Sequence, residues 1–484
     1  MIYQMEQSGF IDKDYVPKKE KLAFGLAGGG QNFCYALIAN YLLYYYVNVL
    51  HINARIVGIM FLFQGIWGLV NGPVAGIIID RTRSKHGKMI PYLRSLSAPL
   101  ALLTVLIFAE PLFIKTTSPT ASIKIIYMVL TYFLWENCFT ITNVAYWGLS
   151  TAISPSPSER TKVLAFTNVM INIMSAIPVV VVPTLLDYIA LKDTHLSLST
   201  AFFVFGVFGG GVGISLFSLS GFLTKERVNQ SEKIPGIKEI FLDIFTNPIL
   251  KVVVASNFIL ALSGITYAFS TYYFIDVLGY ASLSFITQIP LMIFSFITLS
   301  LMQKIKNRWN NKQIMITVFL TQGMTQLIIY LIGIRHHSNI TFMIPLLLIY
   351  YAVLGVCSAL LNVIPVEIIG EATDYSEWKT GIRNEGTNFS LRITTTKIQA
   401  TISQSIASML LPAIGYVTSS SNARVVQTAQ VQSNIWGMFL GLPSILTLLC
   451  AIPYLFYHFV GNQKAKMYEE LEIQRKTANN NAES

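Results

Sequence analysis

Residues 135–147 read WENCFTITNVAYW and place a carboxylate, that of Glu136, near the centre of an apolar stretch of residues 123–150. A helix of this length can cross the hydrocarbon core of a bilayer, which is about 30 Å thick. At 3.6 residues per turn, four polar or aromatic side chains of the stretch lie on one face of that helix: Glu136, Thr140, Asn143 and Trp147. Lipid offers such a face no hydrogen bonds, so we expect it to face a protein interior or an aqueous cavity.

Two interpretations of Glu136 stay open at this point. An ionisable group inside a membrane span marks a working site, such as a substrate or proton pathway. Alternatively, the carboxylate of Glu136 pairs with a cation on a neighbouring helix and only holds the helices together.

The composition of the 484 residues is that of a polytopic membrane protein, with 53% hydrophobic and 12% charged residues. The net charge of +10 comes from basic residues in short segments between apolar stretches, as the positive-inside rule predicts, and not from a basic surface for nucleic acid. The four cysteines fall inside apolar segments without CxxC or Cys/His spacing, so we expect neither a disulfide framework nor a metal site, and no cofactor motif is visible.

Twelve apolar stretches predict an all-α membrane protein with two halves of six transmembrane helices each. The spans of the first half are expected at about 22–49, 55–79, 93–114, 123–150, 163–190 and 199–222. The spans of the second half are expected at about 250–277, 281–303, 313–335, 340–369, 385–416 and 434–460. The resulting organisation is an N-terminal segment 1–21, a bundle 22–222, a linker 223–249 with a surface helix, a bundle 250–460 and a tail 461–484.

Basic residues set the predicted orientation of these spans. Residues 80–94 after the second span and residues 304–312 after the eighth span carry clusters of lysine and arginine at equivalent places of the two halves. Roughly 26 of the 34 lysines and arginines fall on the side of these loops, which predicts that both termini are cytoplasmic. Two equivalent six-helix halves are typical of the parallel repeat of the major facilitator fold.

The first span contains GGGQN at residues 28–32. Each glycine weakens a helix by about 1 kcal/mol relative to alanine, so we expect the glycines to serve close helix approach or a bend beside a cavity. Gln31 and Asn32 then face that cavity, or they join two helices by amide hydrogen bonds.

The eleventh span carries two cations, Arg392 and Lys397. They are five residues apart, about 140° around a helix, and therefore do not share a face. Glu367, near the cytoplasmic end of the tenth span, is a predicted partner of Arg392. Lys397 lies deeper and is the predicted counter-charge of Glu136 across the two halves, which makes a protonatable Glu136 a candidate proton-linked switch.

Three loop motifs resemble one known family. They are DRTRSKHGKMIPYL at 80–93, YWGLSTAISPSPSERTK at 146–162 and EATDYSEWKTGIRNEG at 371–386. In this order they resemble the glycoside-pentoside-hexuronide:cation symporters, the melibiose carrier family, and the resemblance extends from about residue 21 to 457. It implies a sugar symporter of the bacterial inner membrane that works by alternating access.

The resemblance also shows where this sequence departs from that family. Gly68 and Gly72 match the two acidic residues that bind Na+ in the carrier, so Na+ coupling is not expected. Glu136 matches a glycine of the carrier, so H+ coupling through Glu136, or uncoupled exchange, becomes the better interpretation. The carrier's acidic residues for sugar match Asn32 and Asn143. Its arginine and tryptophan on spans five and ten match Asn168 and Asn362, whereas three residues that the family uses match in kind: Thr140, Trp147 and Lys397.

Amide side chains make up most of the candidate substrate site, because each amide both donates and accepts and so suits a polyhydroxylated ligand. The candidates for substrate binding are Gln31, Asn32, Asn143, Trp147, Asn168, Asn172, Asn362 and Lys397. Trp147 offers an apolar face to a sugar ring, and Lys397 suits a carboxylate or sulfonate. The candidates for coupling are Glu136, Thr140 and Lys397.

The remaining charged residues of interest lie at the predicted cytoplasmic ends of the spans, where latches between helices are expected rather than substrate contacts. These gate candidates are Asp80, Arg83, Glu367, Asp374, Arg383 and Arg392. We therefore predict a transporter, not an enzyme, that moves a small glycoside with H+, and for which a monomer suffices. The alternatives are a transporter of another small or amphiphilic solute, and a transporter-like sensor or assembly partner that no longer transports.

Overall fold

The structure is a computed structural model and describes residues 16–114, 118, 120–154, 157–191, 197–227, 247–380, 385–418 and 425–483. Within these residues the regular structure is helical and contains no β-strand, so the predicted all-α class is confirmed. The chain forms two compact units, residues 1–233 with 417–426 and residues 234–416 with 427–484. The predicted surface helix of the linker falls in residues 228–246, outside the described residues.

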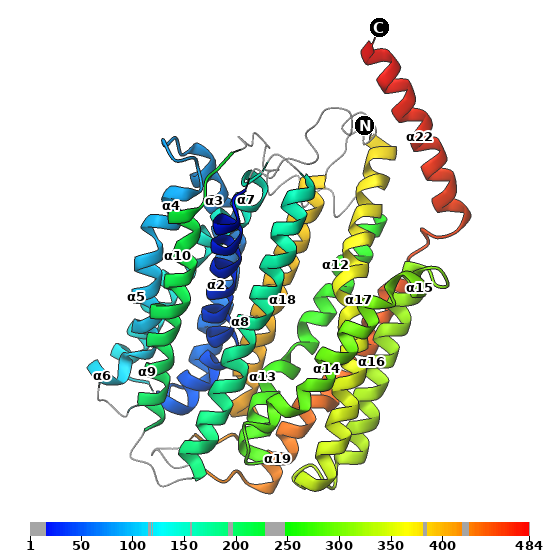
Figure 1. The fold of residues 1–484 in the computed structure, drawn as a ribbon. Helices are drawn as coiled ribbons and strands as arrows, with labels where there is room; N and C mark the ends of the chain where they lie inside the picture. Colours follow the sequence, from blue (N-terminus) through cyan, green and yellow to red (C-terminus); the bar gives the residue numbers. More distant parts are fainter. Residues whose placement is uncertain are drawn as a thin grey trace. The chain divides into compact units, whose positions relative to one another are not determined.

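The first unit contains the first six predicted spans, drawn from blue to green in Figure 1. Its helices are α2 (Lys18–Tyr44), η1 (Tyr45–Val49), α3 (Ala54–Arg81), α4 (Ile90–Ser95), α5 (Ser97–Phe108), α6 (Glu110–Phe113), α7 (Ser122–Ala152), α8 (Pro157–Leu191), α9 (Leu198–Phe208), η2 (Gly209–Gly213) and α10 (Ile214–Leu223). The elements named η are single π-helical turns. The helix α2 packs against α8, α10 and η2, and α7 packs against α3 and α5.

The second unit contains the other six predicted spans. Its helices are α12 (Pro248–Ser263), α13 (Ile265–Tyr272), η3 (Tyr273–Val277), α14 (Leu283–Ser300), α15 (Met302–Lys306), α16 (Asn311–Gly333), α17 (Ile340–Thr380), α18 (Glu385–Ala413), α19 (Ala429–Trp436), η4 (Gly437–Gly441), α20 (Leu442–Leu449), α21 (Ala451–Leu455) and α22 (Asn462–Glu483). The helix α17 packs against both α14 and α16. In the whole described part of the chain, nine helices are long and apolar enough to cross a membrane.

The tenth span is longer than predicted, because α17 continues to Thr380 rather than ending near residue 369. The extra turns are polar, so the prediction from hydropathy ended the span before them. They persist because they pack against α22, where the Trp378 indole donates a hydrogen bond to a Glu470 carboxylate oxygen at 2.8 Å. The helix α17 therefore projects beyond its apolar part.

The glycines of the first span serve close helix approach. A Cβ on Gly28 would lie 2.4 Å from the Tyr146 hydroxyl of α7, and one on Gly29 would lie 2.8 Å from the Met174 side chain of α8. A Cβ on Gly30 would lie 2.2 Å from the carbonyl oxygen of Gly213 in η2. One turn of α2 thus brings three neighbouring helices within reach of its backbone, as small residues do between membrane helices.

A repeated turn ends the first span of each unit. The amides of Leu50 and Leu278 donate to the carbonyls of Tyr45 and Tyr273, each at 3.0 Å, where η1 and η3 end. His51 follows with φ 55° and Gly279 with φ 78°, so both units leave the helix through the left-handed region. This correspondence supports an internal repeat within the chain, as the equivalent basic loops predict.

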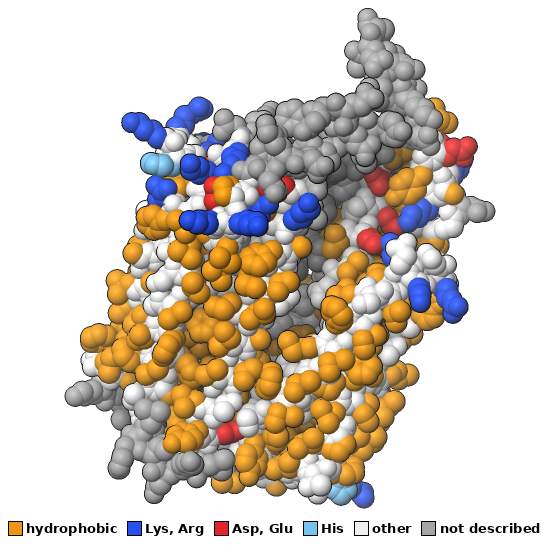
Figure 2. All heavy atoms as spheres, viewed as in Figure 1, with side chains coloured by type: hydrophobic (Ala, Val, Ile, Leu, Met, Phe, Trp, Pro, Cys, Tyr) orange, Lys and Arg blue, Asp and Glu red, His pale blue; other side chains and the backbone are white. Residues whose placement is uncertain are grey.

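Side-chain chemistry changes along the helices of the first unit. Figure 2 shows apolar side chains covering the sides of the helices, and Lys and Arg side chains gathered at the end that carries the loop between α3 and α4. This is the pattern of a protein whose helices lie in lipid and whose basic loops lie at one membrane surface.

Candidate functional site

Helix α7 carries the polar face predicted from residues 135–147. Thr140 is buried, Glu136 and Asn143 are half-buried, and Trp147 is 39% exposed. The Thr140 hydroxyl donates to a Glu136 carboxylate oxygen at 3.4 Å, which is a long hydrogen bond. The face therefore runs from the interior of the first unit to its surface.

Trp135 sets the rotation of α7 that places this face. Its indole is 1% exposed and donates to the Thr104 hydroxyl of α5 at 3.0 Å. It also stacks on Phe139, with ring centroids 4.8 Å apart, and Phe139 stacks on Tyr35 of α2 at 5.3 Å. The stack of Phe139 on Tyr35 joins this side of α7 to α2.

The two amides of the first span differ in their surroundings. Gln31 is 1% exposed, and within the described part of the chain neither of its amide atoms has a hydrogen-bond partner. Asn32 is half-buried, and its amide nitrogen donates to the Gly28 carbonyl at 2.9 Å. Gln31 thus lies inside the unit with its polar atoms available, whereas the amide nitrogen of Asn32 is engaged in its own helix.

Helix α8 presents two amides on one face. Asn168 and Asn172 are four residues apart, lie within the apolar span of residues 162–189, and are both exposed. Exposed amides at this depth are costly in lipid, so this face of α8 requires an aqueous or protein environment.

In the second unit, only part of the predicted site is described. Asn362 is exposed on α17. Arg392 and Lys397 lie on α18, whose backbone is helical, but their side chains fall outside the described residues. The Glu136–Lys397 and Glu367–Arg392 contacts therefore stay predictions.

Two of the gate candidates connect helices within the second unit. Glu367 of α17 forms an ion pair with Lys306 of α15, at 2.7 Å, a partner that the sequence interpretation did not name. Asp374 of α17 accepts a hydrogen bond from the Tyr468 hydroxyl of α22 at 3.0 Å. Arg83 is exposed in the loop after α3, whereas the Asp80 side chain and all of Arg383 lie outside the described residues.

A polar network that sequence reasoning missed lies at the basic end of the first unit. Glu159, at the start of α8, is 4% exposed and accepts hydrogen bonds from the Ser154 hydroxyl at 2.6 Å and the Val16 amide at 3.0 Å. It also forms an ion pair with Lys21 at 3.0 Å. The motif SPSPSERTK contains this carboxylate, but only the fold brings it to α2.

This network predicts an acid-sensitive fold. Burial raises the pKa of the Glu159 carboxyl, but hydrogen bonds from Ser154 and Lys21 outweigh burial and lower its pKa from 4.5 to about 2. Because the folded pKa lies below the unfolded one, this stabilisation is present above pH 4.5 and is lost as the pH falls from 4.5 toward 2. We expect Glu159→Gln to lower the free energy of unfolding at pH 6 by about 2 kcal/mol, with the difference shrinking as the pH falls.

Thermal unfolding of the detergent-purified protein between pH 6 and pH 3 measures this effect. The exposed Glu469 of α22 provides the matched control, since Glu469→Gln removes a carboxylate that has no partner among the described residues. Parallel pH profiles for wild type and Glu159→Gln would contradict the role given to Glu159.

Two further amides were not among the predicted site residues. Gln64 and Asn71 of α3 are 5% and 4% exposed, and each has side-chain atoms without a partner in the described residues. They are seven residues apart and share one face of α3, which packs against α7. The seven-residue spacing of these two amides in an apolar stretch could have identified this polar face from the sequence.

The described structure thus consists of two apolar helical units with amides and a carboxylate on their membrane helices. Among solved structures, the chain is similar in fold to the nucleoside transporter NupG, with a TM-score of 0.62 and 12% identity over 90% of this chain and 99% of that one. It is also similar to the xylose transporter XylE from E. coli, with a TM-score of 0.58 and 15% identity over 94% and 98% of the two chains.

The model of the family described as MFS/sugar transport protein matches residues 23–459, and the chain belongs to this family. It is 27% identical to the isoprimeverose transporter of Lactiplantibacillus pentosus over 99% of this chain and 95% of the relative. It is 26% identical to the putative glycoside/cation symporter YagG of Escherichia coli, over 91% and 89%. It is 24% identical to the putative sulfoquinovose importer of Salmonella typhimurium, over 95% and 94%. The predicted family is confirmed.

Proposed function

We propose that this protein carries a sugar or glycoside across the membrane by alternating access, in symport with H+. The observation that carries the proposal is the family match over residues 23–459, together with relatives named for isoprimeverose and for glycoside/cation symport. The exposed amides of α8 and the polar face of α7 supply the donors and acceptors that a polyhydroxylated ligand requires.

The proposed coupling ion is H+, and its site is Glu136. Na+ needs several oxygen ligands, carboxylates among them, and Gly68 and Gly72 offer none at the positions that match the acidic residues of the melibiose carrier family. Glu136 is the carboxylate on the polar face of α7, with the Thr140 hydroxyl beside it. Gain and loss of a proton at Glu136 would change the charge that faces the substrate.

We place the protein in a bacterial inner membrane with both termini in the cytoplasm. Basic residues gather at the end of the first unit that carries the loop between α3 and α4, which is the cytoplasmic end under the positive-inside rule. The six-helix bundles 22–222 and 250–460 are the two proposed halves of the carrier, and the gate candidates lie at their proposed cytoplasmic ends.

Uptake by proteoliposomes tests this function. Radiolabelled isoprimeverose, a neutral β-glycoside, glucuronate and sulfoquinovose are supplied with no gradient, with an inward H+ gradient, and with an inward Na+ gradient. We expect accumulation of at least one sugar above its equilibrium level with the H+ gradient alone.

Each outcome of this panel decides between the candidates. Accumulation of glucuronate or sulfoquinovose but not of neutral sugars would select an anionic substrate, for which Lys397 is the proposed counter-charge. Accumulation driven by Na+ would overturn H+ coupling. Uptake of no sugar by protein that is folded and correctly inserted would overturn sugar transport and favour another solute or a sensor.

A further inference from the structure

The second unit contains a cavity of about 630 Å³ beside the loop between α15 and α16. Its apolar wall comes from three helices, with Ile305 of α15, Ile314 of α16, and Val356 and Leu360 of α17. Leu360 and Ile314 are 7% and 1% exposed, so the inner end of this cavity reaches the core of the unit. A volume of this size is within the range of small-molecule sites.

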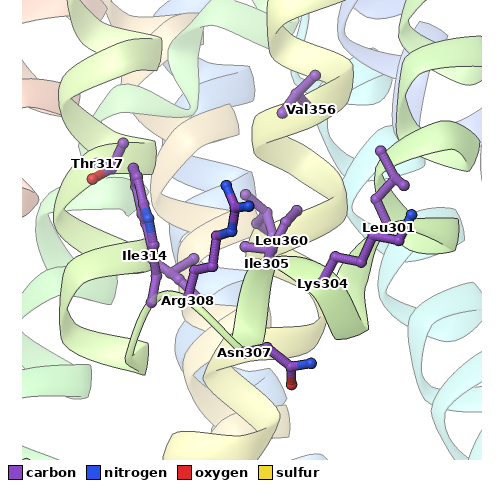
Figure 3. A pocket seen from close by; sticks show the side chains of 10 residues that line it. Leu301, Lys304, Ile305, Asn307, Arg308, Ile314, Thr317, Val356 and Leu360 are labelled. Atoms are coloured by element: carbon purple, nitrogen blue, oxygen red, sulfur yellow. The ribbon is translucent and has the colours of Figure 1, made fainter.

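Two cations line the same cavity. Figure 3 shows the Arg308 side chain extending between Ile314 and Leu360, and Lys304 on the side of Leu301. Within the described residues, neither Lys304 nor Arg308 forms an ion pair. An apolar chamber with two uncompensated cations calls for an anion that also carries an apolar part.

The carboxylates nearby are already engaged by other cations. Glu367 pairs with Lys306 at 2.7 Å, and Glu371 pairs with Lys464 of α22. Glu371 also accepts hydrogen bonds from Tyr457 and, at 2.9 Å, from Asn311. The positive charge at the mouth of the cavity is therefore not neutralised by these neighbours.

The mouth of the cavity lies at the membrane boundary. The apolar helix α14 ends at Ser300 and α16 begins at Asn311, so the loop between them emerges from the hydrocarbon region. Trp309 of this loop lines the cavity and is 44% exposed, as is typical of tryptophan at a membrane interface. Figure 2 shows Lys and Arg side chains over α15 at the border of an apolar surface.

We propose that this cavity binds an anionic phospholipid of the adjacent leaflet. Lys304 and Arg308 hold the phosphate, with the guanidinium group of Arg308 donating to two of its oxygens, and one acyl chain lies along Ile305, Ile314 and Leu360. A free inorganic anion would make no apolar contacts with the wall of the cavity, and a neutral amphiphile would leave both cations unpaired.

This lipid site is separate from the proposed substrate site. Asn362 follows Leu360 by two residues, about 200° around α17, so the two side chains lie on different faces of the helix. Lipid binding is measured here without transport, so its failure leaves the proposed sugar transport untouched.

Binding to the detergent-purified, delipidated full chain tests the proposal, with native mass spectrometry for occupancy and thermal unfolding for stabilisation. The probes are dihexanoyl-phosphatidylglycerol, dihexanoyl-phosphatidylcholine, glycerol 3-phosphate and inorganic phosphate. We expect phosphatidylglycerol to bind and to raise the unfolding temperature. The double variant Lys304→Gln/Arg308→Gln should weaken its binding by about 30-fold while leaving the unfolding temperature without lipid unchanged.

The matched control removes two exposed lysines of the first unit, as Lys18→Gln/Lys85→Gln, and should bind phosphatidylglycerol like wild type. Equal binding of phosphatidylcholine would overturn the preference for an anionic lipid. Equal protection by glycerol 3-phosphate or phosphate would identify a free-anion site instead. If the control variant loses as much phosphatidylglycerol binding as the double variant, the effect comes from net charge and not from this cavity, which would overturn the proposal.

Discussion

Proteoliposomes that contain Glu136→Gln are expected to lose substrate accumulation driven by an H+ gradient while still exchanging substrate across the membrane. The amide of glutamine has nearly the shape of the carboxyl group and still accepts the hydrogen bond from Thr140, but it cannot carry a proton. A gradient of about one pH unit supplies about 1.4 kcal/mol per H+, and so supports about tenfold accumulation. We expect that tenfold accumulation to fall to the equilibrium level in the variant.

The control for this experiment is another carboxylate of the same unit. Glu110 is 1% exposed in α6, so Glu110→Gln removes the same kind of group at a different place in the unit. We expect Glu110→Gln to retain accumulation. If proteoliposomes with Glu136→Gln accumulate substrate like wild type, Glu136 has a structural role. Its carboxylate would then only hold neighbouring helices together.

Gly30→Ala is expected to destabilise the first unit although alanine favours helices. The added Cβ would lie 2.2 Å from the carbonyl oxygen of Gly213 and 2.8 Å from the Leu216 Cβ, and backbone cannot rotate away as a flexible side chain can. Overpacking of this kind costs about 1–3 kcal/mol, which exceeds the gain of about 1 kcal/mol from helix propensity. We expect a lower unfolding temperature in detergent and less folded protein in the membrane.

Gly211→Ala is the matched control, because it makes the same chemical change in η2, two residues from Gly213. A Cβ on Gly211 meets no heavy atom within 4 Å in the described structure, and we expect this variant to be as stable as wild type. A Gly30→Ala protein with the wild-type unfolding temperature would show that α2 and η2 do not approach as closely as described.

Most of the membrane helices could be located from hydropathy. Hydropathy is a local property, and a stretch such as residues 123–150 must cross the bilayer wherever its neighbours are, so the helical spans were predictable. The role of the glycine cluster at 28–30 could also be predicted, because three glycines destabilise a helix and close helix packing offsets that loss of stability. The loop motifs were sufficient for the family.

The contacts between side chains of different helices could not be predicted from the sequence and follow from the fold. The partner of Glu367 is Lys306, which lies 61 residues earlier in the chain and has no signature in the tenth span. Gln31 is buried because α2 packs against α8, α10 and η2, and its amide atoms have no hydrogen-bond partner among the described residues. These outcomes depend on how each helix is rotated against its neighbours, and periodicity defines a polar face without defining what that face touches.

The cavity beside α15 is the clearest case of what sequence could not supply. From the sequence, Lys304 and Arg308 could be identified only as members of a basic loop. Leu360 could be identified only as one of many apolar residues in the tenth span. The fold brings them to one chamber because α14 and α16 both pack on α17, and the α15 loop crosses between them. The number of charged residues can be counted from the sequence, whereas the ion-pair partner of each charged side chain depends on how the helices pack.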